Sequence, residues 1–278
     1  MSSLLSAPGV LGFRAGLCVT TGLSRSTFYR DCRALVSKAD PDLEILKKIR
    51  KIVLDMPGYG YRRVAAHLAR EGTAVNRKKV LGLMRRDNLL CRRRRKFVTT
   101  TDSNHGLAVY PNLVPSICRR RTNQLWIADI TYIRLPTGFI YLAAVLDVCS
   151  RKAIGWALGK SIDTQLTLAA LQMALSARGA PLYHHSDRGV QYASSEYVAL
   201  LCANSVQISM SRSGNPYDNA NMESFMKTLK YEEVLINDYQ TIEQAKENID
   251  YFIGKVYNQI RLHSALGYLT PDEFDADN

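Results

Sequence analysis

Three strand-like segments joined by very short turns constrain the fold of this 278-residue chain more than any other feature of its sequence. The segments run from Leu125 to Arg134, from Phe139 to Val148 and from Lys152 to Lys160, and each is rich in β-branched, aromatic and other apolar residues. Because only a few residues separate them, consecutive segments pair with each other in antiparallel fashion. The sequence therefore predicts an antiparallel meander.

Helical and strand-like patterns alternate after the meander. Asp163 precedes an amphipathic stretch that stops at Gly179, and a second helix is predicted from Ser194 to Asn204. Each helix is followed by a short strand-like run, Leu182–Ser186 and Val206–Met210. This order predicts an α/β fold with a mixed five-stranded sheet, as in ribonuclease H-like domains.

The charge of the chain is divided unevenly between its two halves. Residues 1–124 hold 25 Lys and Arg against 8 Asp and Glu, whereas the remaining residues hold 12 against 17. A strongly basic region is typical of proteins that bind a polyanion, because each neutralised phosphate releases condensed counterions. Nucleic acid is the predicted partner, and a merely solvated basic surface is the alternative.

The basic half is predicted to be helical. Val19–Leu35 has the outline of a helix-turn-helix, a weak signal by itself, and three short helices are predicted over Leu43–Leu54, Tyr61–Arg70 and Asn76–Arg86. We therefore expect an all-α DNA-binding region over residues 1–97, a linker rich in Thr, Ser, Asn and Pro over 98–118, and a catalytic core over 119–278.

Many polar positions of the basic half carry Lys or Arg. The run Arg92–Lys96 is predicted to contact DNA, and the alternative is a solvated linker. A linker that follows a DNA backbone satisfies both interpretations. The residues of this half that are predicted to contact DNA are Arg62, Arg63, Arg77, Lys78, Lys79, Arg92, Arg93, Arg94 and Arg95.

Three acidic residues occupy positions where a carboxylate can do chemistry. Asp129 interrupts an apolar row on the first strand, Asp187 ends a strand and opens a loop, and Glu223 lies beside the apolar stripe of a predicted helix. Each also has an ordinary explanation: a hydrogen-bonded Asp, a turn cap and an i, i+4 pair of Glu223 with Lys227. The three together, however, form the oxygen-ligand set that two Mg²⁺ ions need for displacement at phosphorus.

The sequence resembles the DDE transposases of the IS-three insertion-sequence family. The resemblance rests on WIADITYI, HHSDRGVQY and NANMESFMKTLK, with 35 residues between Asp187 and Glu223 and with Lys230 seven residues after Glu223. It continues upstream in PGYGYRRVAAHL and VNRKKVLGLMRRDNL and downstream in YNQIRLHSALGYLTPDEF. The chain departs from the family pattern at Asn221, often Pro, and at Leu262, which interrupts the usual Arg-Pro-His run.

The resemblance implies a core like that of retroviral integrases and metal-dependent strand cleavage and strand transfer at terminal inverted repeats. It implies that Asp129, Asp187 and Glu223 are catalytic residues and bind Mg²⁺ or Mn²⁺, two ions in all. Lys230, Lys227 and Arg188 are then expected to contact the DNA. It also implies self-association in the active complex and cooperation with the product of an upstream reading frame, since this chain resembles a second reading frame.

Two other functions remain open from the residues alone. One is a DNA-binding regulator, or a partial transposase subunit, whose acidic core is inactive; the other is a general ribonuclease H-like nuclease, which the basic half disfavours. The six cysteines are scattered without a metal-ligand spacing, and no apolar stretch has the length of a membrane helix. We therefore expect reduced thiols and a bacterial cytoplasmic protein associated with the nucleoid through DNA, with no membrane partner.

Overall fold

A computed structural model describes residues 42–91, 108–117, 121–212 and 219–278 of the chain. The predicted helix-turn-helix over Val19–Leu35, the basic run Arg92–Arg95 and most of the linker at 98–118 lie outside the described residues. The chain separates into two compact units, with the division between Lys51 and Ile52.

The described part of the basic half contains the three predicted helices, α3 (Leu43–Asp55), α4 (Tyr61–Arg70) and α5 (Arg77–Arg86). Asn76 caps α5, because its Oδ1 accepts a hydrogen bond from the backbone N–H of Lys78 at 2.8 Å. Helices α4 and α5 contact each other. The side chains that these two helices bury are Val64, Ala65, Leu68, Val80, Leu83 and Met84.

The second half of the chain forms one mixed sheet of five strands in the order β3-β2-β1-β4-β5. The strands are β1 (Leu125–Leu135), β2 (Gly138–Asp147), β3 (Ala153–Gly159), β4 (Tyr183–Ser186) and β5 (Gln207–Met210). The first three pair antiparallel as a meander, and β4 and β5 join in parallel beside β1. The predicted ribonuclease H-like fold with its mixed five-stranded sheet is confirmed, and each predicted strand differs from the observed one by a single residue at one or both ends.

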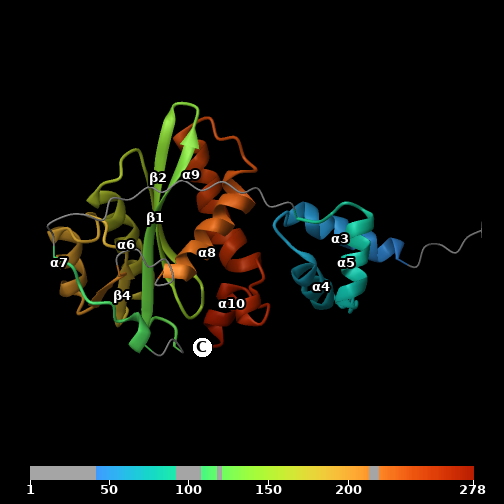
Figure 1. Cartoon of the computed structure of the whole chain (residues 1–278), viewed down its shortest axis with the longest axis horizontal. Helices are drawn as coiled ribbons and strands as arrows, with labels where there is room; N and C mark the ends of the chain where they lie inside the picture. Colours follow the sequence, from blue (N-terminus) through green and yellow to red (C-terminus); the bar gives the residue numbers. More distant parts are fainter. Residues whose placement is uncertain (1–41, 92–107, 118–120, 213–218) are drawn as a thin grey trace, which may run out of the picture. The chain divides into compact units, whose positions relative to one another are not determined.

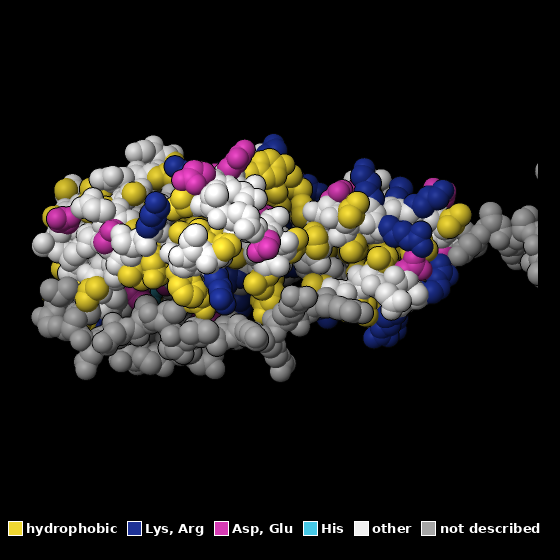
Figure 2. All heavy atoms as spheres, turned by 90° about the horizontal axis from the view of Figure 1, so that it is seen from above, with side chains coloured by type: hydrophobic (Ala, Val, Ile, Leu, Met, Phe, Trp, Pro, Cys, Tyr) yellow, Lys and Arg dark blue, Asp and Glu magenta, His cyan; other side chains and the backbone are white. Residues whose placement is uncertain are grey.

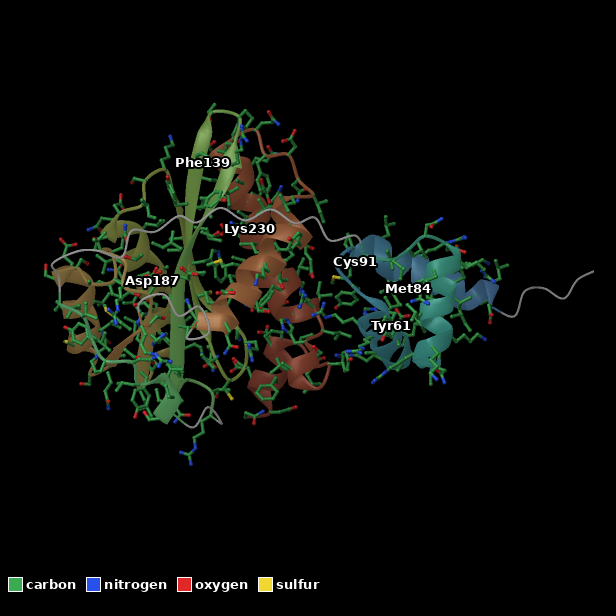
Figure 3. The ribbon with its side chains drawn as sticks, in the orientation of Figure 1. Tyr61, Met84, Cys91, Phe139, Asp187 and Lys230 are labelled. Carbon is green, nitrogen blue, oxygen red and sulfur yellow. The ribbon has the colours of Figure 1, made fainter. Side chains whose placement is uncertain are left out.

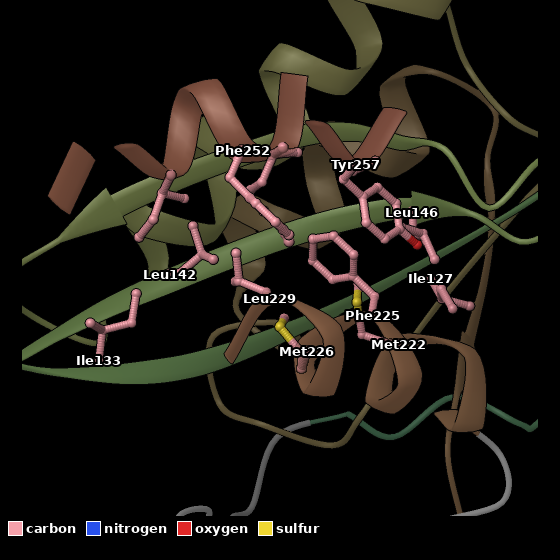
Figure 4. Packing of buried hydrophobic residues seen from close by; sticks show 14 of the residues in the cluster. Ile127, Ile133, Leu142, Leu146, Met222, Phe225, Met226, Leu229, Phe252 and Tyr257 are labelled. Carbon is pink, nitrogen blue, oxygen red and sulfur yellow. The ribbon is translucent and has the colours of Figure 1, made fainter. Parts of the chain in front are cut away.

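Helices cover both faces of this sheet (Figure 1). Helices α6 (Thr164–Arg178) and α7 (Ser195–Ala203) pack on one face with Trp126, Ala128 and Val145. Helices α8 (Ala220–Leu229) and α9 (Ile242–Tyr251) pack on the other. Figure 4 shows how α8 reaches the sheet, with Met222, Phe225, Met226 and Leu229 beside Ile127, Ile133, Leu142 and Leu146.

The C-terminal segment adds short and irregular helices on the side of the sheet that α8 covers. Two π-helical turns, η3 (Lys230–Val234) and η4 (Phe252–Ile260), follow α8 and α9 directly. Helix α10 (Pro271–Ala276) begins with a capping box formed by Thr270 and Glu273. The remaining described elements are the 3₁₀ turns η1 (Val114–Ser116) and η5 (Ser264–Leu266).

In the part of the chain that the structure describes, no helix combines the length and the apolar character needed to cross a bilayer. The described cysteines, Cys91, Cys149 and Cys202, are free thiols, as predicted.

Candidate active site

Asp129 lies in the middle of β1, on the face that packs against α8. Leu125, Ile127 and Ile133 of the same row are buried in the cluster that contains the apolar side of α8. The Oδ1 of Asp129 accepts a hydrogen bond from the backbone N–H of Ile130 at 2.8 Å. The predicted interruption of an apolar row by a carboxylate is therefore present.

Asp187 follows the last residue of β4, the strand that pairs in parallel with β1. Ile127 is opposite His185 in this pairing, and continuing the same register by two residues puts Asp129 opposite Asp187. Paired residues of neighbouring strands point to the same face, so both carboxylates belong to the α8 side. In the view of Figure 3, Asp187 and Lys230 lie on either side of β1.

Gly189 allows the tight loop that holds Asp187. Its backbone N–H donates to Asp187 Oδ1 at 2.9 Å, and a Cβ at this position would lie only 3.0 Å from the same oxygen. Any side chain at residue 189 would therefore press on the carboxylate.

Glu223 lies in the first turn of α8, the helix that covers this face of the sheet. Its Oε2 is 3.3 Å from Lys227 Nζ, and both side chains are exposed by more than 40%. The ordinary i, i+4 pair that the sequence allowed is thus present, and such exposed pairs contribute less than about 1 kcal/mol. The pair does not hold Glu223 firmly in place.

The electrostatics of Asp129 link the three carboxylates. Burial raises the pKa of Asp129 to about 7, and the charges of Asp187 and Glu223 add to this effect. The N–H of Ile130 and the ammonium of Lys230 oppose it. The three acids are therefore close enough to repel one another, although no three described Asp, Glu, His or Cys side chains are grouped tightly enough to hold an ion as they stand.

Lys230 opens the π turn η3 immediately after α8. Its Nζ lies 4.2 Å from the ring centroid of Tyr132, a cation–π contact, and Phe139 packs edge-on against that ring at 5.5 Å. Burial lowers the pKa of Lys230, and the charge of Asp129 partly restores it. Sequence reasoning missed Tyr132, because strand alternation assigns a residue three positions after Asp129 to the opposite face of β1.

The loop at Asp187 is anchored from β5. His185 is fully buried between two hydroxyls, with Nδ1 2.8 Å from Ser209 Oγ and Nε2 3.0 Å from Ser211 Oγ. Arg188 Nε donates to the carbonyl of Ser211 at 2.8 Å. His185 thus ties β4 to Ser209 and Ser211, and Arg188 helps to fix the loop that carries Asp187.

The turn between β2 and β3 reaches α8 through Arg151, a contact that sequence reasoning also missed. The Arg151 guanidinium donates to Asn221 Oδ1 at the start of α8. Asp147 organises this turn, because its Oδ1 accepts from the N–H groups of Cys149 and Ser150 at 2.8 and 3.1 Å. The departure from the family pattern at Asn221 therefore has a local structural role.

The predicted DNA-contacting residues Arg62, Arg63, Arg77, Lys78 and Lys79 lie on α4 and α5 and not on the elements that carry the carboxylates, whereas Arg92–Arg95 lie outside the described residues. Figure 2 shows Lys and Arg side chains gathered over the part of the chain that contains α3, α4 and α5. The exposed members of the predicted set are Arg62, Arg77, Lys78 and Lys79, whereas Arg63 is half-buried with its guanidinium 5.7 Å from the ring centroid of Tyr59.

Comparisons with known proteins agree with this architecture. Two integrase core domain models match residues 119–216 and 204–271, and an HTH-like domain model matches residues 40–97. The uncharacterized 31 kDa protein of insertion element IS600 from Shigella sonnei is 38% identical over 93% of this chain and 97% of its own length. The chain belongs to the IS3 family of transposases.

Other relatives of this IS3-family transposase show the same level of identity. The transposase for IS904 of Lactococcus lactis is 38% identical over 87% of this chain and 98% of its own. Transposase InsF for IS3A of Escherichia coli is 38% identical over 79% of this chain and 77% of its own. The membership predicted from the sequence motifs is confirmed.

Solved structures with lower similarity include retroviral integrases. The catalytic core domain of HTLV-2 integrase in complex with magnesium is 18% identical, covers 55% of this chain and 96% of its own, and has a TM-score of 0.44. A simian T-cell lymphotropic virus intasome chain is 16% identical, covers 82% of this chain and 74% of its own, and has a TM-score of 0.48.

Proposed function

We propose that this IS3-family transposase is a DDE-type polynucleotidyl transferase whose catalytic residues are Asp129, Asp187 and Glu223. Its substrate is double-stranded DNA at the terminal inverted repeats of an insertion sequence and at the target. The observation that supports the proposal is a carboxylate on β1, Asp129, that feels the charges of Asp187 at the end of β4 and of Glu223 on α8. Their mutual repulsion contributes to the raised pKa of Asp129.

The donor set fits a hard divalent cation. Asp129, Asp187 and Glu223 offer only carboxylate oxygens, the ligands that Mg²⁺ and Mn²⁺ prefer, and a cation would relieve their repulsion. Among the described residues, the exposed contact with Lys227 holds Glu223, and breaking such a contact costs little. Two bound Mg²⁺ ions would stabilise the charge on the attacking and leaving oxygens of a displacement at phosphorus.

The chain's own groups position the DNA for two steps. In the first step, water bonds to phosphorus while the bond from this phosphorus to the 3′ oxygen at the element end breaks, which leaves a 3′-OH on the element and a 5′-phosphate on the flanking strand. In the second step, that 3′-OH gives up its proton to solvent and its oxygen bonds to a phosphorus of the target strand, while the bond from this phosphorus to its own 3′ oxygen breaks and leaves a 3′-OH on the target. Lys230 presents a half-buried ammonium next to Asp129, where it can hold a phosphate oxygen. Lys227, once released from Glu223, and Arg188 offer further positive charge on the same side.

We propose that the basic residues of α4 and α5 contact the DNA backbone, together with the run Arg92–Arg95. Salt-dependent binding is the expected result of such contacts. Joining two element ends brings two stretches of terminal-repeat DNA into one complex, which favours at least a dimer, so we also propose self-association in the active complex. The upstream reading frame product is a second proposed partner.

The test is a cleavage assay with a labelled duplex that carries the terminal repeat of the element. Wild-type protein is incubated with Mg²⁺, with Mn²⁺ or with EDTA, beside the variants Asp129→Asn, Asp187→Asn and Glu223→Gln. Glu243→Gln is the matched control, because Glu243 also lies in the first turn of a helix and is exposed, but belongs to α9.

We expect metal-dependent nicking at the repeat boundary by wild-type and Glu243→Gln protein. In each triad variant the nicking rate should fall by a factor on the order of 10³ or more, while DNA binding is retained. Residual strand transfer by a well-folded triad variant would contradict the assignment. Binding without nicking by the wild type would favour the alternative of a DNA-binding remnant or a subunit that needs its partner, and adding the upstream region separates these two.

A further inference from the structure

The proposed function leaves the segment Pro57–Gly60, immediately before α4, without a role. Tyr59 of this segment is fully buried, although it lies in a short connection between helices. Its hydroxyl accepts a hydrogen bond from the backbone N–H of Leu262 at 2.7 Å. Both residues belong to the compact unit Ile52–Asn278, so the start of α4 is fastened to the C-terminal segment.

Next to Leu262, an ion pair is almost completely removed from solvent. Arg261 donates through two nitrogens to the two carboxylate oxygens of Glu232, each at 2.7 Å. Only 4% of the Arg261 side chain and 8% of the Glu232 side chain are exposed. A fork of this kind fixes the position and the orientation of both side chains.

Gly58 lies directly against this pair. A Cβ on Gly58 would be 2.3 Å from both Cγ and Oε1 of Glu232, far inside van der Waals contact. Glu232 cannot swing aside at low cost, because Arg261 holds it by two hydrogen bonds in a buried place. Only glycine therefore fits at residue 58 while Glu232 keeps its position.

Glu232 and Lys230 belong to the same five-residue π turn, η3. The turn is closed by a backbone hydrogen bond of 2.8 Å from Leu235 N to Lys230 O. A shift of Glu232 therefore carries Lys230 with it, away from the ring of Tyr132 and from Asp129.

We propose that Gly58 and Tyr59, acting through the Glu232–Arg261 pair, are positioning residues that hold Lys230 at the reacting DNA. We call Gly58, Tyr59, Glu232 and Arg261 the π-turn anchor. It joins the segment before α4 to the turn η3, so that the placement of Gly58 and Tyr59 sets the geometry of Lys230. The role of Lys230 at DNA rests on the proposed function, whereas its position does not.

The test compares Gly58→Ala with Gly60→Ala in the full chain. Gly60 is the matched control, since it lies two residues away in the same segment and a Cβ there meets nothing within 4 Å. Lysine labelled with ¹³C at Cε is incorporated, and the Lys230 signal is assigned from its disappearance in Lys230→Arg. A Cε over the face of Tyr132 is shielded by the ring and gives an upfield signal, measured without DNA or metal.

We expect the upfield Lys230 signal in wild-type and Gly60→Ala protein and its loss in Gly58→Ala. The rate of strand cleavage at saturating DNA should fall about tenfold to a hundredfold in Gly58→Ala, as for a displacement of about 1 Å, while the dissociation constant for DNA stays within about twofold. A merely structural role would lower the melting temperature and leave the Lys230 signal of the folded protein in place.

An unchanged Lys230 signal in folded Gly58→Ala overturns the proposal, whatever happens to cleavage. If Gly58→Ala does not fold, Tyr59→Phe is measured in its place, because this change removes only the hydroxyl that accepts the hydrogen bond from Leu262 N–H. Loss of the upfield Lys230 signal in Tyr59→Phe supports the proposal, and retention of the signal overturns the proposal. A wild-type chain that shows the signal but does not cleave DNA contradicts the proposed function and leaves the π-turn anchor supported.

Discussion

Removing one partner of the buried pair Glu232–Arg261 should destabilise the protein far more than removing one partner of an exposed pair of the same length. Glu44 and Lys47 in α3 provide the comparison, with an N–O distance of 2.8 Å and side chains that are 78% and 60% exposed. The corresponding distance in the buried pair is 2.7 Å. The two pairs therefore differ chiefly in burial, and we compare Glu232→Gln with Glu44→Gln.

The expected magnitudes follow from the environment. At 2.7 Å an effective dielectric constant of about 20 gives a gross attraction of about 6 kcal/mol, which is offset by the desolvation of two ions at several kcal/mol each. In Glu232→Gln the desolvation of Arg261 is no longer compensated, so we expect a loss of about 3–5 kcal/mol in the free energy of unfolding. Arg63 is a second cation close to Arg261, and its pKa is lowered by burial and by the charge of Arg261. Its repulsion of an uncompensated Arg261 increases the loss. Glu44→Gln should leave the free energy of unfolding almost unchanged, because exposed ion pairs contribute little to stability.

Urea unfolding followed by circular dichroism measures both losses. The double variant Glu232→Gln/Arg261→Met removes both charges and should recover most of the stability, because a buried apolar side chain needs no counterion. The reasoning is refuted if Glu232→Gln costs no more than Glu44→Gln, or if the double variant is less stable than Glu232→Gln alone.

The remaining predictions concern packing, pH and salt. Gly155→Ala should destabilise the protein by about 3 kcal/mol in urea unfolding, because its Cβ would lie 2.2 Å from the backbone oxygen of Ala170 in α6. Gly82→Ala, inside α5 with nothing within 4 Å of the new Cβ, should instead stabilise it by about 0.5–1 kcal/mol. Burial lowers the pKa of His184 to about 3. Between pH 6.5, its ordinary pKa, and pH 3, only the unfolded chain therefore binds a proton at this imidazole. The free energy of unfolding should then fall by about 1.4 kcal/mol per pH unit as the pH decreases toward 3. In His184→Gln the urea midpoint should fall less steeply with decreasing pH, because this contribution is absent. Arg77→Ala should reduce the slope of log binding constant against log salt by about 1 in fluorescence anisotropy titrations; an unchanged slope would exclude a phosphate contact.

The regular elements of the chain were predictable because each has a strong local signal. The meander, the helix after Asp163 and the three basic helices differ from the structure by one or two residues at their ends. Local hydrogen bonds account for this: Asp163 Oδ1 accepts from the N–H of Leu166 at 2.9 Å, and Ser194 caps α7 in the same way. Such caps depend on residues three apart, which a sequence displays directly.

Part of the candidate site was also visible in the sequence. The alternation of β1 predicted that Asp129 shares a face with Ile127 and Ile133, and the loop after β4 predicted a place for Asp187. The i, i+4 relation of Glu223 and Lys227 was equally local. The assignment of these residues to catalysis stays a proposal, and the geometry around them defines what the assay must test.

What joins the site to the rest of the molecule is not local. Tyr132 under Lys230, Arg151 on Asn221 and Arg261 on Glu232 connect residues that are between 29 and 98 positions apart along the chain. No periodicity records such contacts, because the pairing depends on how helices and strands stack and on which turns close between them.

The sequence by itself determined the strand and helix order, the basic and acidic halves and the identity of the three acids, because period, capping and charge are local properties. Only the tertiary structure decided that β4 pairs beside β1 with His185 opposite Ile127, two residues before Asp187 and Asp129, and that Gly58 meets Glu232. The physical reason is that these contacts depend on packing between distant segments, where burial raises the pKa of Asp129 and fixes an ion pair that water would otherwise loosen.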